Sequence, residues 1–197
     1  MTTEVYRVLV IDDNPAIHED FMKIIQGMQR KSLASDALAA KIFRDEAANE
    51  SAAREVAVEM DTASQGEEGV EMIRKAVEEN RPYSLAIVDM RMPPGWNGIE
   101  TLREMWKWDG NIQTVICTAY SDHSWEDYRR ELGDRPGLLI LKKPVEPVVL
   151  MQAVSELSRR GSNKRKLREM LEILREQHHD TARKIEMATK LIDESSV

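Results

Sequence analysis

The sequence predicts an α/β protein built on a doubly wound, five-stranded parallel sheet. Short β-prone runs alternate with amphipathic stretches along most of the chain, and this alternation is typical of parallel sheets with helices on both faces. The run 84–89 is almost wholly apolar until it ends in Asp89, as expected of a strand buried on both faces. Polar residues follow four of the runs, at the strand ends where open α/β sheets bind ligands.

Each expected element follows from its own pattern. The strands are expected at residues 5–11, 56–63, 84–89, 111–118 and 137–141. The helices are expected at residues 15–28, 67–79, 99–108, 124–132 and 146–159. Asn14 is placed to cap the first helix, because Pro15 suits a first helical position. Val70, Ile73 and Val77 are expected to form the buried stripe of the second helix.

Residues 29–55 are polar and rich in alanine, and they are too many for an ordinary connection between a helix and a strand. We interpret them as an insertion in one domain that covers residues 1–160, helical in its first half. Gly161 to Asn163 is expected to end the last helix of that domain, and residues 161–197 form a separate C-terminal helix.

Composition excludes several classes of function. A net charge of -7 argues against nucleic-acid binding through general electrostatics, so we expect no direct DNA binding. The single cysteine, Cys117, cannot form an intramolecular disulfide and fits a reducing compartment. The amino terminus has no signal-peptide pattern, and no apolar run approaches the ~20 residues that span a bilayer. We therefore expect a cytoplasmic protein without a membrane partner.

Charged and polar residues gather at the expected carboxyl ends of four strands. They are Asp12 and Asp13, Asp89, Thr118, and Lys143 followed by Pro144. The adjacent acids have two readings: they complement a helix dipole, or they provide oxygen ligands for a hard cation such as Mg²⁺. The turn after the first strand has no glycine fingerprint, which argues against a dinucleotide site.

This set of residues resembles the receiver domain of bacterial two-component response regulators. The resemblance covers about Val5 to Arg159, except the insertion, and it implies the flavodoxin-like strand order 2-1-3-4-5. It further implies that a histidine kinase or phosphotransfer protein phosphorylates Asp89, and that this switches a protein–protein interaction.

The resemblance also implies a role for each site residue. Asp13, Asp89 and the backbone carbonyl of Arg91 would bind Mg²⁺, while Asp12 would act through a bound water. Lys143 would neutralise charge on the phosphoryl group, and the hydroxyl of Thr118 would donate a hydrogen bond to it. Lys142 should point to the opposite face of its strand from Lys143.

The sequence departs from the receiver pattern in two places. The turn Pro93-Pro-Gly-Trp-Asn-Gly98 is one residue longer than usual. Ile140 stands three residues before Lys143, where receivers commonly have a tyrosine or phenylalanine that switches position. Two roles remain open for Tyr120: its side chain screens the phosphorylation site, or it packs in the domain.

Residues 164–195 lack glycine and proline and have an apolar seam at alternating spacings of four and three. The seam comprises Leu167, Leu171, Leu174, His178, Thr181, Ile185, Ala188 and Ile192. This heptad pattern predicts a coiled-coil homodimer, and the alternative is one helix folding back on the domain. The pair His178 and His179 has no convergent acid that would make it a metal site.

Taken together, these features predict a phosphorylation-dependent receiver that acts on a downstream protein partner and is not an enzyme. One alternative is that the chain is the receiver part of a larger hybrid kinase or cyclase. Another is a Mg²⁺-dependent phosphatase of the haloacid dehalogenase type. Such phosphatases carry a second acid two residues after the nucleophile, and here that position is Arg91.

Overall fold

The computed structural model describes residues 4–27, 56–119 and 125–194. The predicted insertion, 29–55, and Tyr120 lie outside the described residues, so the expectations for them stay predictions. The chain divides into two compact units, residues 1–161 and 162–197, and each is described by itself.

The first unit is built on a five-stranded sheet with the order β2-β1-β3-β4-β5. All four pairings are parallel, which confirms the predicted α/β fold and strand order. The strands are β1 (Glu4–Ile11), β2 (Val56–Ala63), β3 (Leu85–Asp89), β4 (Gln113–Thr118) and β5 (Leu138–Lys142). The helices are one at residues 15–27, α2 (Gly66–Glu78), α3 (Gly98–Trp108), α4 (Trp125–Leu132) and α5 (Pro147–Glu194).

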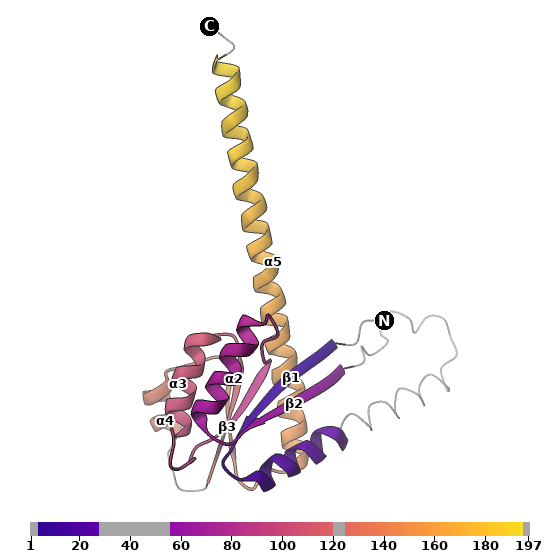
Figure 1. Ribbon diagram of the computed structural model, residues 1–197, viewed down its shortest axis with the longest axis vertical. Helices are drawn as coiled ribbons and strands as arrows, with labels where there is room; N and C mark the ends of the chain where they lie inside the picture. Colours follow the sequence, from indigo (N-terminus) through magenta and orange to yellow (C-terminus); the bar gives the residue numbers. More distant parts are fainter. Residues whose placement is uncertain (1–3, 28–55, 120–124, 195–197) are drawn as a thin grey trace, which may run out of the picture. The chain divides into compact units, whose positions relative to one another are not determined.

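Helices cover both faces of the sheet, with α2, α3 and α4 on one face and α5 with helix 15–27 on the other (Figure 1). Alternate residues of each central strand enter the two apolar layers. In β1, Leu9 and Ile11 pack in the α2–α3 layer, while Val8 and Val10 pack with α5. β3 and β4 are buried along their whole lengths, because a central parallel strand has a helical layer on each face.

Local capping explains where the first helix begins. The side-chain oxygen of Asn14 accepts a hydrogen bond from the amide of Ala16 at 3.0 Å, as its predicted capping role requires. In α2 the prediction was partly wrong. Val70 and Ile73 are buried with Ala76, but Val77 is 36% exposed. The stripe shifts by one residue because Ala76 is small enough to lie against the neighbouring elements.

The prediction that Gly161 ends the last helix is wrong, because α5 runs without a break from Pro147 to Glu194. A Cβ atom at Gly161 would overlap the backbone carbonyl oxygen of Ser84, which directly precedes β3. The glycine therefore allows α5 to pass close to the backbone at the amino end of β3, and its role is packing rather than helix termination.

In the second unit, the described part of α5 carries large apolar side chains that are exposed. They are Leu167, Met170, Leu171, Ile173 and Leu174, each 48–60% exposed. Three of them belong to the predicted heptad seam, whose pairing stays a prediction. No helix of the described residues is both long enough and apolar enough to cross a membrane.

Candidate functional site: an acidic pocket at the carboxyl edge of the sheet

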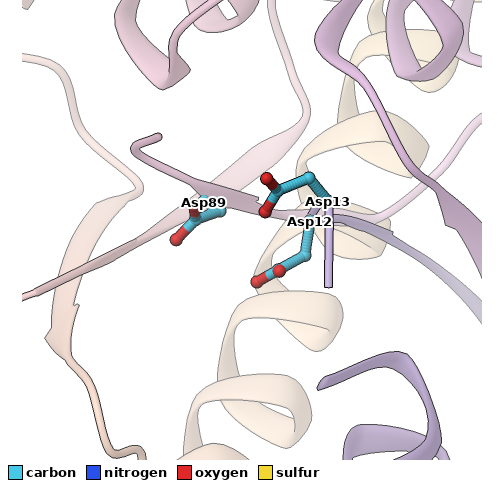
Figure 2. Close-up of side chains that lie close together, drawn as sticks. All are labelled: Asp12, Asp13 and Asp89. Carbon is cyan, nitrogen blue, oxygen red and sulfur yellow. The ribbon is translucent and has the colours of Figure 1, made fainter. Parts of the chain in front are cut away.

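The predicted site residues meet at one edge of the sheet because their strands are parallel. Asp12 and Asp13 follow β1, Asp89 ends β3, and Lys143 follows β5. The three aspartates each offer one carboxylate oxygen within 4.8 Å of the others, and Figure 2 shows these side chains next to one another. Asp12 and Asp89 are buried, whereas Asp13 is exposed. Asp13 is thus the most accessible of the three carboxylates.

Lys143 lies between two of the carboxylates. Its Nζ is 2.5 Å from Oδ1 of Asp89 and 2.8 Å from Oδ2 of Asp12. Burial alone would lower the pKa of Lys143, but its hydrogen bonds to Asp12 and Asp89 outweigh burial and raise it. The lysine is therefore a permanent positive charge in the pocket. Lys142, the last residue of β5, is exposed.

The two acids after β1 differ in what their oxygens contact. Oδ1 of Asp12 accepts a hydrogen bond from the backbone amide of Asn14 at 3.0 Å, and Oδ2 accepts one from the ammonium group of Lys143. Both of its oxygens already have donors from the protein. Asp13 is exposed beside it, so its carboxylate is the more accessible of the two.

Asp89 is held by its own turn and by the lysine. Its Oδ2 accepts the amide of Arg91 at 3.0 Å, and its Oδ1 faces Lys143. Burial raises the pKa of the Asp89 carboxyl, and the nearby negative charge of Asp12 acts in the same direction. The hydrogen bond and charge of Lys143 oppose this shift and favour the carboxylate.

This donor set fits a hard divalent cation. The pocket offers carboxylate oxygens, which Mg²⁺ prefers, and among the described residues one lysine, Lys143, contacts two of its three acids. A divalent cation would compensate the negative charge that the lysine leaves unbalanced.

A family model described as "Response regulator receiver domain" matches residues 43–155, more than half of the chain. The chain belongs to the response regulator receiver family. The matched residues begin after β1, so the structure, rather than the family match, places Asp12 and Asp13 beside Asp89 in this receiver domain. A receiver is a phospho-accepting signalling module and not a catalytic enzyme, and the phosphatase alternative has no support from this family.

Solved structures with the same fold are distant in sequence. A receiver domain protein (CheY-like) from Methanospirillum hungatei JF-1 is 20% identical with a TM-score of 0.56, and the match covers 82% of this chain and 99% of that one. A receiver domain protein from Clostridium thermocellum is 23% identical with a TM-score of 0.53, and the match covers 82% of this chain and 98% of that one. An adenylate cyclase from Rhodopirellula baltica is 20% identical with a TM-score of 0.57, and the match covers 87% of this chain and 98% of that one. At these identities the likeness shows the fold alone. None of the curated proteins matches the chain.

Thr118 lies at the same edge, and its hydroxyl is bonded to the backbone of the next residue. The residue ends β4 and is buried, and its Oγ1 donates to the carbonyl oxygen of Ala119 at 3.1 Å. Ile140, where receivers commonly have an aromatic ring, lies half-buried in β5 against the α2–α3 layer. The structure thus brings Thr118 to the edge with its hydroxyl bonded to the neighbouring backbone.

The long turn after Asp89 closes on the backbone of the same strand. The amide of Gly98 donates to the carbonyl of Met90 at 3.0 Å. A Cβ at Gly98 would lie 2.7 Å from the carbonyl oxygen of Asp89, so the turn can close here only on glycine. Asn97 and Glu100 then begin α3 with a capping box.

Sequence reasoning missed two residues that hold this turn, Gln65 and Glu67. Gln65 is the N-cap of α2, and Glu67 lies in its first turn. An acid in a first helical turn is so common as a partner of the helix dipole that it gave no sign of a longer-range contact. The unusual length of the turn was a sign that residues outside it would have to stabilise it.

Proposed function

We propose that this receiver is phosphorylated on Asp89, in a Mg²⁺-dependent reaction, by a histidine kinase or a phosphotransfer protein. The observation that supports the proposal best is the meeting of three carboxylates and Lys143 at one edge of the sheet. Asp89 is the acid of this group that ends a central strand and lies against the lysine. Phosphorylation would then alter the binding of a downstream protein partner.

In the proposed transfer, one phosphoryl group passes from an imidazole nitrogen of the donor to a carboxylate oxygen of Asp89. An oxygen of Asp89 forms the new P–O bond as the P–N bond to the donor imidazole breaks, and the imidazole nitrogen keeps the electron pair of that bond. Lys143 lies beside the attacking carboxylate and neutralises charge on the phosphoryl oxygens. The hydroxyl of Thr118 would turn away from Ala119 to donate to the same group.

Asp13, Asp89 and the backbone carbonyl of Arg91 would hold Mg²⁺, with Asp12 acting through a bound water. The exposed carboxylate of Asp13 and the occupied oxygens of Asp12 support this division. When bound, the cation neutralises phosphoryl oxygens and orients them for in-line transfer. We propose the cytoplasm as the compartment, where the buried free thiol of Cys117 would stay reduced.

Intact-mass measurement after incubation with acetyl phosphate and Mg²⁺ tests the assignment. The wild type should gain the mass of one phosphoryl group, and Asp89→Asn should not. Asp134→Asn is a suitable control, because it removes a carboxylate that is 86% exposed, and it should be modified like the wild type. A phosphoryl adduct on the Asp89→Asn protein would exclude Asp89 as the acceptor.

We further propose that the C-terminal part of α5 pairs with a second copy of the chain and so passes on the state of the receiver. A long helix with exposed leucines is marginal in water by itself, and the heptad seam supports pairing. His178 and Thr181 weaken the seam, which leaves the dimer sensitive to changes in the receiver.

Sedimentation equilibrium of the full chain tests the pairing. Leu174→Asp places a charge in the seam and should yield monomers. Ile173→Asp places the same charge on a neighbour of similar exposure that lies outside the seam, and it should stay dimeric. A wild type that is monomeric with and without beryllofluoride would show that the helix is not a dimerisation element.

The alternative, in which the chain is the receiver part of a larger hybrid kinase or cyclase, keeps the same chemistry at Asp89. The full reading frame beyond Val197 distinguishes the two cases.

A further inference from the structure

The turn after Asp89 is tied at its tip to the beginning of α2. The side-chain oxygen of Gln65 accepts a hydrogen bond from the backbone amide of Gly95 at 3.2 Å. The side-chain nitrogen of Gln65 donates one to the carbonyl of Pro93 at 3.4 Å. The carboxylate of Glu67 accepts the amide of Trp96 at 3.2 Å. We call Gln65 and Glu67 the α2 clamp. It supplies acceptors for two successive backbone amides of the turn, and the amide of Gly95 also donates to the carbonyl of Met92 within the turn at 3.1 Å.

At its base the same turn is part of the acidic pocket. Arg91, whose amide donates to Asp89, lies two residues before Pro93, where the turn begins. Gly98, which closes the turn, donates to Met90 and lies against the backbone of Asp89. The base of the turn is therefore joined to the backbone of Asp89–Arg91.

Two glycines allow the turn and the clamp to approach each other closely. A Cβ at Gly95 would lie 2.5 Å from Oε1 of Gln65 and 2.7 Å from Oε2 of Glu67. A Cβ at Gly66, between the clamp residues, would lie 3.2 Å from the Cβ of Trp96 and would also overlap Thr101. A side chain at either position would force the clamp and the turn apart.

We propose that Gln65 and Glu67 are positioning residues for the cation site, which they influence through the turn and not by contact with the cation. By fixing the tip of the turn they hold the backbone of Asp89–Arg91 in the arrangement that the cation needs. The inference rests on the proposed function in one respect, that the acidic pocket binds Mg²⁺.

A Mg²⁺ titration of the full chain, followed by tryptophan fluorescence, tests the clamp, since Trp96 lies in the turn itself. Glu67→Ala removes the acceptor of the Trp96 amide and should weaken Mg²⁺ binding by roughly 2- to 10-fold, the effect expected of one lost hydrogen bond. Glu67→Gln keeps an acceptor oxygen and should bind nearly as the wild type does. Glu68→Ala is the matched control, because Glu68 accepts the amide of Ser64 at 2.7 Å and does not contact the turn.

Gly95→Ala tests the same contact without a change of charge. The new Cβ would displace the ends of both clamp side chains, so Mg²⁺ binding should weaken as in Glu67→Ala. Urea unfolding of each variant without Mg²⁺ should show that the fold is retained. Wild-type affinity in both Glu67→Ala and Gly95→Ala would overturn the inference, and so would an equal loss in Glu68→Ala, which would indicate a general charge effect.

Mass measurement of the phosphoryl adduct separates this inference from the proposed function. Modification of the wild type together with unchanged Mg²⁺ binding in the clamp variants would overturn the clamp alone. Weaker Mg²⁺ binding in the clamp variants without any adduct on the wild type would overturn phosphorylation and leave the clamp supported. A wild type that binds no Mg²⁺ would overturn both.

Discussion

Two clusters of charged side chains lie on the sheet, and they differ in charge balance more than in geometry. The carboxyl-edge cluster comprises Asp12, Asp13, Asp89 and Lys143. The β1–β2 cluster comprises Arg7, Glu59, Asp61 and Arg81, together with Tyr83. The contacts are similarly short in both, since Arg7 lies 2.7 Å from Asp61 and Lys143 lies 2.8 Å from Asp12.

In the β1–β2 cluster the charges cancel. Arg7 and Arg81 both contact Glu59, and Arg7 also contacts Asp61. The hydroxyl of Tyr83 donates to Asp61 at 2.7 Å, and Arg7 stacks on the Tyr83 ring at 4.3 Å. Among the described residues, two cations meet two acids here, which leaves no excess charge for a ligand to neutralise. It holds β1, β2 and the start of β3 together.

In the part of the carboxyl-edge cluster that the structure describes, three acids meet one lysine, and the exposed Asp13 is one of these acids. The comparison teaches that closeness of charges does not identify a functional site. An unbalanced charge at the carboxyl ends of parallel strands marks a candidate site. Four predictions test this distinction.

The largest effect is expected at Asp13. Asp13→Ala removes an accessible oxygen ligand and should lower Mg²⁺ affinity by more than about 100-fold, whereas Asp12→Ala should lower it by roughly 10- to 100-fold, as for a residue acting through water. Asp61→Ala, in the balanced cluster, should leave it unchanged. Calorimetric titration measures all three, and equal losses at Asp12 and Asp13 would contradict the division of roles.

Lys143 should separate cation binding from phosphoryl binding. Lys143→Ala leaves the acids of the pocket in place, so Mg²⁺ should still bind. The loss of a cation beside the phosphoryl oxygens should weaken beryllofluoride binding roughly 100-fold. Lys142→Ala, which changes the exposed neighbour, is the control. The register of β5 would be in error if Lys142→Ala had this effect and Lys143→Ala did not.

Arg7 should matter for stability and not for the cation site. Arg7→Met leaves Asp61 and Tyr83 without their shared cation, which should lower the free energy of unfolding by about 2 kcal/mol. Urea denaturation measures the loss, and Mg²⁺ affinity in the same variant should equal that of the wild type. A fall in Mg²⁺ affinity would show that the two clusters are coupled.

The smallest effect is expected at Tyr83. Tyr83→Phe removes the hydrogen bonds of its hydroxyl and should cost about 1 kcal/mol at neutral pH. Burial and the hydrogen bond to Asp61 raise the pKa of Tyr83 above its usual value. Above pH ~10 the unfolded chain therefore releases a proton that the folded chain retains, and the stability of the wild type falls as pH rises.

This alkaline fall should be smaller in Tyr83→Phe, so the unfolding free energies of the two proteins should converge between neutral pH and pH ~11. Denaturation curves at a series of pH values provide the test. A constant difference across that range would mean that Tyr83 ionises equally in both states.

The sequence by itself determined the fold class and the acidic pocket. Parallel strands force their carboxyl ends onto one edge, so Asp12, Asp13, Asp89 and Lys143 could be placed at that edge from the alternation of strands and helices, while the order of the strands came from the resemblance to receivers. The roles proposed for these residues came from the resemblance to receivers. Periodicity was less reliable at single positions, because Val77 and Ala76 both fit the helical pattern and only packing selected Ala76.

The tertiary structure decided what depends on contacts between distant parts of the chain. Gly161 was expected to end a helix, yet it lets α5 pass the carbonyl of Ser84, a contact that a local pattern cannot show. Gln65 and Glu67 gave no local sign of their contact with a turn about thirty residues away. Local sequence fixes which backbone shapes are favourable, but which groups meet across the fold depends on how helices and loops pack, and that is a property of the whole chain.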